Sequence, residues 1–422
     1  MIRALRLAAV IAALVAATSP APAAAQSLAI RGGTVHTLAG PAIPEATIVV
    51  EAGRITAVGP QVTVPAGAEV IDAAGLHVYP GFFDAFTELG LREIESVEVT
   101  NDVAELGEFN PHLLAFTAVH PPSEHIPVAR ANGITHAVTA PDARAGGVGG
   151  QASLIRLDGW TVEDMVVSPS VGFILDWPTI ALGGDRTYNA AREEYDEQIT
   201  RLGRWLEDAR RYDLAVQEEQ PVPRDLRLEA FSRLTRGELP LMVSVREDRY
   251  MRDAVAFAAA QDIRVVILGG NQAWKMRDEL AAQSIPVILG PTQALPSGPD
   301  ESYDEQYNAP ALLHEAGVRF AFATFSSPDA RTLPFQAGNA VPYGLPHEEA
   351  LKAVTVRAAE IYGVDDRLGT IEVGKLANLI VTDGDPLEYT TRLVHVIIDG
   401  KEVGFDNRHL GLYETYRERP VQ

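Results

Sequence analysis

The sequence predicts a (β/α)8 barrel joined to a small β-sandwich that is built from both ends of the chain. Short apolar runs alternate with helical patterns through the middle of the chain, and β-type runs lie at both ends. The 422 residues, 46% of them hydrophobic, are enough to bury a large core. The sequence carries no dinucleotide-binding glycine fingerprint, which favours a closed barrel over an open, doubly wound sheet.

Residues 1–25 have the layout of a secretory signal peptide. Arg3 and Arg6 precede an apolar run that is too short to span a bilayer, and the segment ends in small residues. Cleavage after Ala25 would leave Gln26 as the first mature residue, so we expect a secreted or periplasmic protein. The chain has no cysteine, which excludes a lipoprotein anchor, disulfides and a thiolate metal site.

The charge of the chain restricts its partners. The formal net charge is −22, and removal of the two arginines of the signal peptide would make it more negative. Such a surface repels phosphate backbones and anionic lipids. We therefore expect no nucleic-acid partner, and no membrane association once the signal peptide is removed.

The β-type runs at the two ends define the expected sandwich. Its N-terminal part is predicted over residues 26–80 and its C-terminal part over residues 368–408, followed by a tail at 409–422. The turn dipeptides Ala52-Gly53 and Asp399-Gly400 separate neighbouring strands. The strand candidates are residues 28–30, 47–50, 54–58, 69–72, 377–382, 394–398 and 401–403.

Residues 81–367 are predicted to form the barrel. Its apolar runs lack alternation, as expected for parallel strands that are covered on both faces. The strand candidates are residues 133–139, 241–245, 263–268, 285–289 and 318–324. The helix candidates between them are residues 188–218, 250–260, 273–282 and 309–316.

Several short motifs resemble one known family when their order and spacing are taken together. Residues 53–59 read GRITAVG, residues 79–84 read YPGFFD, and residues 368–375 read LGTIEVGK. The run DGDPL at 383–387 follows, and 349–361 carries a related helical pattern. The chain thus resembles the amidohydrolase superfamily, in particular its imidazolonepropionase-like and Xaa-Pro dipeptidase-like branch.

The resemblance implies a site at the C-terminal rim of the barrel that hydrolyses carbon–nitrogen bonds. Members of the family hold zinc or a similar divalent metal there, and such a metal lowers the pKa of bound water to about 7. The first two ligands are histidines at alternate positions of the first strand, because alternate residues face the same way. Phe86 and Glu88 occupy these positions here.

The remaining ligand positions of the family also differ in this chain. The strand-five histidine corresponds to Ser244, with Arg246 as the other inward candidate, and the strand-six histidine corresponds to Gly269. The aspartate of strand eight, usually the general base, corresponds to Phe325. One carboxylate does not make a transition-metal site, so we expect no metal cofactor. Because strands one and eight are neighbours in a closed barrel, we expect the rings of Phe86 and Phe325 to pack together.

Two polar residues are expected at the barrel mouth in place of a metal. Glu88 and Arg246 should both point there, and a buried carboxylate needs a cation or hydrogen-bond donors. They form either a structural ion pair or, as the catalytic candidates, a metal-free acid–base site in which burial shifts the pKa of Glu88. Asp84 is expected to remain as a structural or supporting acid.

Two other segments carry weaker functional signals. His120, Glu124 and His125 lie in one proline-broken loop and could bind a metal, although exposed loop residues of these types are more often solvated. The glycine-rich run that includes Gly149, Gly150 and Gln151 lacks the ending of a phosphate loop. It is interpreted as a pocket loop or as a plain flexible turn. The other histidines are scattered and are expected to be structural or solvated.

Two functions remain open. In the first, the chain is an inactive or weakly active amidohydrolase homologue that binds a small amide or peptide-like ligand, or forms a homo-oligomer or a hetero-oligomer with an intact amidohydrolase. In the second, it is an active hydrolase of carbon–nitrogen bonds with a non-standard or metal-free site. The residues at the ligand positions favour the first.

Overall fold

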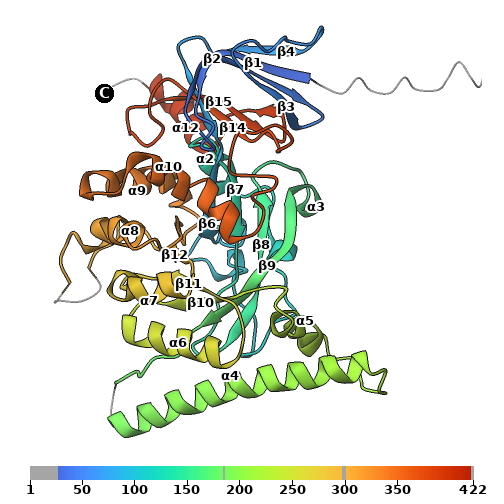
Figure 1. Ribbon diagram of the computed structural model, residues 1–422, viewed down its shortest axis with the longest axis vertical. Helices are drawn as coiled ribbons and strands as arrows, with labels where there is room; N and C mark the ends of the chain where they lie inside the picture. Colours follow the sequence, from blue (N-terminus) through green and yellow to red (C-terminus); the bar gives the residue numbers. More distant parts are fainter. Residues whose placement is uncertain (1–26, 184–185, 297–300, 420–422) are drawn as a thin grey trace, which may run out of the picture.

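The computed structural model describes residues 27–183, 186–296 and 301–419 and is drawn in Figure 1. The predicted signal peptide and its cleavage site lie outside the described residues. Within them the chain forms two separate sheets of eight strands each. One sheet combines the two ends of the chain, and the other forms a nearly closed barrel, as the sequence predicts.

The terminal sheet is assembled around strand β5, which has a strand from each end of the chain as its neighbours. The strand order is β16-β15-β14-β5-β1-β2-β3, and β4 pairs with β1. These strands are β1 (Ser27–Val35), β2 (Ile43–Glu51), β3 (Arg54–Gly59), β4 (Glu69–Asp72), β5 (His77–Pro80), β14 (Leu379–Thr382), β15 (Leu393–Ile398) and β16 (Lys401–Val403). Strand β14 runs antiparallel to β5, whereas β1 runs parallel to it.

The barrel sheet follows the chain in order from β6 to β13. Its strands are β6 (Phe82–Thr87), β7 (Ile134–Thr139), β8 (Val148–Arg156), β9 (Val166–Asp176), β10 (Leu241–Val245), β11 (Val265–Gly269), β12 (Val287–Leu289) and β13 (Phe320–Phe322). The first and last strands meet at a seam: the backbone N–H of Phe325 donates to the carbonyl of Phe86 at 2.9 Å, and the Thr87 hydroxyl donates to the carbonyl of Ser326 at 3.2 Å.

One strand of the barrel departs from the all-parallel arrangement that a (β/α)8 barrel requires. Strand β8 runs antiparallel to both β7 and β9, whereas β9 is parallel to β10. The connections at 140–147 and 157–165 are too short for a helical crossover, which needs a dozen or more residues. The barrel is therefore closed as predicted, but short antiparallel connections replace the strand–helix units on either side of β8.

The helices lie mainly on one side of the barrel. Figure 1 shows α6 to α10 on that side and the long helix α4 at one end of the molecule, with α5 beside it. The α-helices are α2 (His125–Arg130), α3 (Val162–Met165), α4 (Tyr188–Gln217), α5 (Leu226–Thr235), α6 (Asp248–Ala260), α7 (Arg277–Ala282), α8 (Glu305–Glu315), α9 (Leu333–Ala340), α10 (His347–Ala353), α11 (Val356–Ile361) and α12 (Arg408–Arg417). Five short 3-10 helices are also described, η1 (Glu98–Thr100), η2 (Ala115–Ala118), η3 (Ala273–Met276), η4 (Ala330–Thr332) and η5 (Val341–Tyr343).

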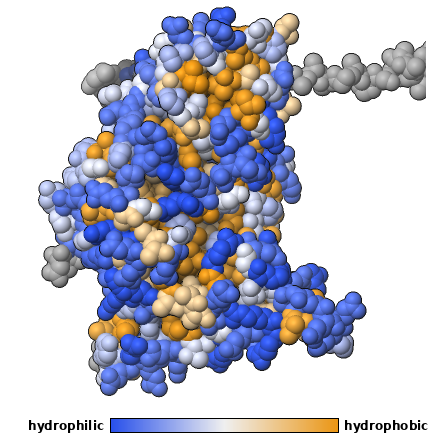
Figure 2. All heavy atoms as spheres, in the orientation of Figure 1, coloured by the Kyte–Doolittle hydropathy of each residue, from blue (hydrophilic) through white to orange (hydrophobic). Residues whose placement is uncertain are grey.

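Alternate residues of the barrel strands divide between two cores. Met242, Leu268 and Ala321 belong to the core inside the barrel, whereas Val243 and Ile267 pack in the core toward the helices. This division follows the period of two of a strand and decides which side chains can reach the barrel mouth. Figure 2 shows a mostly hydrophilic face, with apolar residues gathered over part of the terminal sheet. In the described part of the chain, no helix has the length and apolar character needed to cross a membrane.

Candidate functional site

The barrel mouth is the end at which the parallel strands finish, and two aromatic rings occupy its seam. Phe86 comes from β6, and Phe325 lies just after β13. Their ring centroids are 4.7 Å apart at an interplanar angle of 34°, and Phe86 is only 9% exposed. This is an ordinary distance for an aromatic pair. The expected contact between the two rings is confirmed.

Phe325 holds an unusual backbone conformation. Its φ is +54°, in the left-handed region that large side chains rarely adopt. A conformation of this kind costs on the order of 1–3 kcal/mol and persists only where surrounding contacts fix it. The hydrogen bond from its N–H to Phe86 is one such contact. The backbone therefore turns sharply at the position that the resemblance assigns to a catalytic aspartate.

Asp84 supports this turn from inside the protein. Its carboxylate is fully buried and accepts hydrogen bonds from the backbone N–H of Thr324 at 3.0 Å and from the Thr324 hydroxyl. The backbone N–H of Phe86 is also directed at it, at 3.4 Å. Burial raises the pKa of Asp84 to about 7, although these hydrogen bonds act in the opposite direction. Asp84 thus connects β6 to the segment that follows β13.

Glu88 pairs with a different cation from the one expected. Its carboxylate lies 3.0 Å from Nε of Arg92, four residues along the chain, and Arg246 is exposed. The predicted ion pair between Glu88 and Arg246 is wrong. The chain turns directly after β6, where the backbone N–H of Arg92 donates to the carbonyl of Glu88. This turn places the Arg92 side chain next to the Glu88 carboxylate. Burial and the charge of Asp142 raise the pKa of Glu88 to about 7.

Two further carboxylates lie at the same mouth, and sequence reasoning missed both. Asp176 ends strand β9, where burial and the charge of Asp142 raise its pKa to about 6, while Arg246 and Ser244 act in the opposite direction. Asp142 accepts a hydrogen bond from Nη2 of Arg92 at 3.2 Å. An apolar run that ends in an acid, residues 171–176, was the signal that could have identified Asp176.

Ser244 and Gly269 occupy different environments in the barrel. Ser244 is partly exposed and is on the same face of β10 as the inward-facing Met242. Gly269 ends β11 with a φ of +84°, and by alternation Leu268 rather than Gly269 faces the barrel interior. The protein thus presents a hydroxyl and a bare backbone at the two positions that the resemblance assigns to histidines.

The glycine-rich run belongs to a strand and not to an open loop. Gly149 and Gly150 are buried in β8, and a side chain on Gly149 would lie 2.1 Å from the carbonyl oxygen of Asp142. Gln151 is 3% exposed, and its amide donates to the carbonyl of Pro111 at 2.7 Å. Both the pocket loop and the flexible turn are therefore incorrect as local structure. The glycines allow neighbouring backbone to pass close over β8.

The donors at the mouth do not fit the metal that the family carries. Phenyl rings and a glycine offer no ligand atom, and Glu88 is already paired. The two histidines of the loop that could have bound a metal lie in different environments. His120 is exposed, whereas the His125 ring forms a hydrogen bond with the carbonyl of Glu93 at 2.9 Å. Over the described ranges, no group of three or more His, Asp or Glu residues could hold a metal ion.

Comparisons with known proteins agree with the fold. The model of the amidohydrolase family matches residues 278–403. The amidohydrolase tasK of Hapsidospora irregularis is 25% identical over 84% of this chain, which spans only 39% of that relative. The imidazolonepropionase of Sphingopyxis alaskensis is 42% identical over 19% of this chain and 21% of its own length.

A solved structure extends this likeness over almost the whole chain. The crystal structure of an amidohydrolase from Thermotoga maritima is 26% identical, with a TM-score of 0.78 over 90% of this chain and 100% of that one. The same barrel and terminal sheet therefore occur in a protein of this class. The family model, the shorter matches to imidazolonepropionases and this solved structure together support placing the chain in the amidohydrolase superfamily, with local similarity to the imidazolonepropionase-like branch.

Proposed function

We propose that this member of the amidohydrolase family is an exported protein that binds a small amide or peptide-like ligand at its barrel mouth and has lost metal-dependent hydrolysis, wholly or in large part. The observation that carries the proposal is the contact between Phe86 and Phe325, whose centroids are 4.7 Å apart. The resemblance assigns both positions to groups that bind metal or activate water. Hydrocarbon rings can do neither, and together they fill the space between the two strands.

The metal content of the purified protein tests this proposal. We expect less than stoichiometric zinc, manganese or iron by mass spectrometry, and no turnover of dipeptides or cyclic amides that depends on added Zn²⁺. The control is the same preparation after treatment with a chelator, which should behave identically. Stoichiometric metal, or turnover that the chelator abolishes, would overturn the proposal.

A second candidate function is hydrolysis without a metal. It is favoured by the carboxylates of Glu88 and Asp176, whose pKa values are raised to about 7 and about 6 at the same mouth. A general base works best when its pKa is near the working pH. Glu88 would take a proton from water as the oxygen adds to the amide carbon, and would then return that proton to the departing nitrogen. The C–N bond breaks, giving a carboxylic acid and an amine.

The pH dependence of turnover separates the two functions. A metal-free hydrolase should show chelator-resistant activity that rises as pH increases through about 7 and that the Glu88→Gln substitution abolishes. Arg192→Gln, which changes an exposed pair on α4, is the matched control and should leave activity unchanged. If wild type has no chelator-resistant activity above buffer, the second function is excluded.

Assembly and export are parts of the proposal that need separate tests. Native pull-down followed by mass spectrometry should recover an intact amidohydrolase if the chain acts as a subunit, and light scattering should report a dimer or larger species if it assembles with itself. A monomer that recovers no such partner would contradict both assemblies. For export, sequencing of the protein from its native source should begin at Gln26, and a chain that still begins at Met1 would contradict it.

A further inference from the structure

The floor of the barrel, which is the end opposite the mouth, meets the terminal sheet through polar side chains. His136 of β7 pairs in register with Arg156 of β8, and by alternation both lie on the inward face of their strands with Val138 and Leu154. The turn between β15 and β16 brings Asp399 against Arg156, with which it forms an ion pair. In Figure 1 the terminal sheet lies at this end of the barrel. The two parts of the protein are therefore joined here by a polar contact.

Four buried polar atoms of this contact have no hydrogen-bond partner within the parts of the chain that the structure describes. They are Nε2 of His136, Nε of Arg156, Nδ2 of Asn378 and Oδ1 of Asp399. His136 is 2% exposed and Asn378 is 8% exposed, and the backbone N–H of Asp399 donates to Oδ1 of Asn378 at 2.8 Å. Buried polar atoms are nearly always paired with protein groups or with ordered water. These four atoms therefore need a partner from outside the chain.

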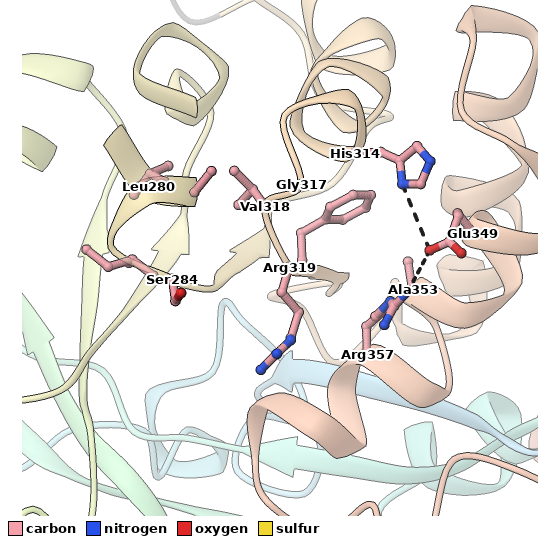
Figure 3. Close-up of a pocket in the computed structure, with 12 residues that line it drawn as sticks. Leu280, Ser284, His314, Gly317, Val318, Arg319, Glu349, Ala353 and Arg357 are labelled. Carbon is pink, nitrogen blue, oxygen red and sulfur yellow. Dashed lines mark hydrogen bonds and ion pairs between the residues drawn. The ribbon is translucent and has the colours of Figure 1, made fainter. Parts of the chain in front are cut away.

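The ionic groups beside the start of β13, at the same end of the barrel, have partners within the protein. Glu349 lies 4.0 Å from Nδ1 of His314 and 2.9 Å from Nη2 of Arg357, as Figure 3 shows. A position at this end of the barrel therefore does not by itself leave a polar group unpaired.

The hydrogen bonds around His136 make its unpaired nitrogen an acceptor. The hydroxyl of Thr135 has a single hydrogen, which it donates to the carbonyl of Phe82 at 3.3 Å. Towards Nδ1 of His136, 3.1 Å away, the hydroxyl must then accept, so Nδ1 carries the ring hydrogen. Burial lowers the pKa of His136 to about 4, so the ring is neutral at pH 7 and Nε2 keeps its lone pair. Because Oδ1 of Asp399 is also an acceptor, the two atoms cannot bond to each other directly.

We propose that the floor of the barrel is a binding site for ordered water, which joins His136 to Asp399. A water molecule there donates one hydrogen to Nε2 of His136 and the other to Oδ1 of Asp399. Its oxygen accepts from Nε–H of Arg156 and from the amide of Asn378. Buried waters typically make two to four such bonds to polar groups that would otherwise be unpaired.

The donors and acceptors of the site select water over an ion. Two acceptors and two donors face it, and water can serve both kinds. An anion would serve only the donors, and an ammonium ion only the acceptors. His136 and Arg156 come from the barrel, whereas Asn378 and Asp399 come from the segments before β14 and after β15. The site is therefore complete only when the terminal sheet has docked on the barrel, and it does not depend on the function proposed for the mouth.

A crystal structure of the whole protein, at a resolution that shows ordered water, tests the site. We expect a water oxygen within about 3.2 Å of Nε2 of His136 or Oδ1 of Asp399, and of at least one of the two donors. Soaking in bromide separates water from an anion, because only an anion site gains an anomalous signal. The proposal is overturned by the absence of density at the site, by a bromide peak there, or by a direct bond between His136 and Asp399.

Nitrogen-15 NMR of the histidine rings tests the same site in solution. We expect His136 to carry its hydrogen on Nδ1 at pH 7, and its ring proton Hε1 to show cross-relaxation with a long-lived water molecule. His395, whose Nδ1 bonds directly to Glu402 at 2.6 Å, is the internal control and should show no long-lived water. A hydrogen on Nε2 of His136 would make that atom a donor to Asp399, and would overturn the proposal, as would the absence of the water signal.

A variant at Asn378 tests the donors. Asn378→Asp removes the hydrogens of Nδ2 but keeps the oxygen that accepts from Asp399, so we expect loss of the water signal at His136. Asn189→Asp makes the same change at an exposed position of α4 and should leave the signal unchanged. Circular dichroism checks that both variants are folded, and the measurements on wild type decide the proposal if Asn378→Asp is not. An unchanged signal in folded Asn378→Asp would contradict the site as described.

Discussion

The carboxylates at the two ends of the barrel have pKa values shifted in opposite directions. At the mouth, burial raises the pKa of Glu88 to about 7 and that of Asp176 to about 6. At the opposite end, burial acts on Glu349 in the same direction, but hydrogen bonds from Arg357 and Lys352 outweigh it and lower the pKa. A group whose pKa is raised in this way makes the folded state less stable when it is ionised. The mouth therefore keeps poorly compensated acids, whereas the far end keeps well-paired ones.

This contrast separates an end of the barrel whose acids are costly to ionise from an end whose acids are stabilised by neighbouring cations. Perturbed titrating groups collect at functional sites, although structural ion pairs also perturb them. In barrels, active sites lie at the C-terminal ends of the strands. The mouth of this protein holds two carboxylates with raised pKa values, Glu88 and Asp176, together with the contact between Phe86 and Phe325. The following substitutions test that division, beginning with the largest expected effect.

Removal of a ring at the seam should cause the largest loss of stability. Phe86→Ala empties a buried position and should lower the free energy of unfolding by about 3–5 kcal/mol, measured by urea denaturation. Phe325→Gly is the companion variant. It should cost less, because glycine adopts the left-handed backbone without strain and so offsets part of the lost contact. If Phe86→Ala costs less than about 1 kcal/mol, the rings do not support the barrel.

The ion pairs of Arg357 with Glu349 and Glu360, at the end of the barrel opposite the mouth, should contribute less to the stability of the protein. Arg357→Met leaves Glu349 and Glu360 without their closest shared partner and should lower the free energy of unfolding by about 1–2 kcal/mol. Arg367→Met, at a similarly exposed arginine with one neighbouring acid, should change it by less than about 0.5 kcal/mol. Equal losses in the two variants would show that these ion pairs have no special structural role.

Asp84 should give the protein a distinctive dependence on pH. Its pKa of about 7 in the folded state exceeds its ordinary value of 3.8, so the folded protein binds the proton more tightly than the unfolded chain does. Stability should therefore fall as pH rises from about 4 to about 7, by at most about 1.4 kcal/mol per pH unit for this group. Asp84→Asn should flatten the profile over that range in denaturation experiments. An unchanged slope would mean that Asp84 does not titrate in this way.

The smallest effect is expected at Glu88. Glu88→Gln removes a half-buried pair with Arg92 and should change the free energy of unfolding by less than about 0.5 kcal/mol at pH 7. The variant should gain stability relative to wild type as pH rises from about 4.5 to about 7, because over that range the folded state disfavours the ionisation of wild-type Glu88. A loss of more than about 2 kcal/mol would place Glu88 among the structural residues instead.

The sequence predicts the elements of this fold well where one periodicity dominates. The apolar runs at 241–245 and 263–268 correspond closely to β10 and β11, and the helical pattern at 188–218 corresponds to α4. Strands β8 and β9 were missed because the glycines of β8 are typical of a loop. The structure explains why a glycine stands in this strand: a Cβ atom at Gly149 would lie only 2.1 Å from the carbonyl oxygen of Asp142, which passes over it.

The candidate site could be predicted only in part. The contact of Phe86 with Phe325 followed from the neighbouring positions of the first and last strands in a closed barrel. The partner of Glu88 could not be predicted in this way. A sharp turn after β6 places Arg92 beside its carboxylate, and the sequence does not show that turn. The positive φ of Phe325 has no signature in a sequence that places phenylalanine there. Such a conformation is imposed by contacts between segments more than two hundred residues apart, such as Asp84 and Thr324.

The position of β5 between β1 and β14 determines when the protein can finish folding. One edge of β5 stays open until residues 379–382 have left the ribosome, since only β14 covers it. An unpaired edge is a template for other chains. Shortened proteins that end before β14 should consequently aggregate rather than yield a smaller soluble barrel. The last tenth of the chain thus completes the sheet that the first strands begin.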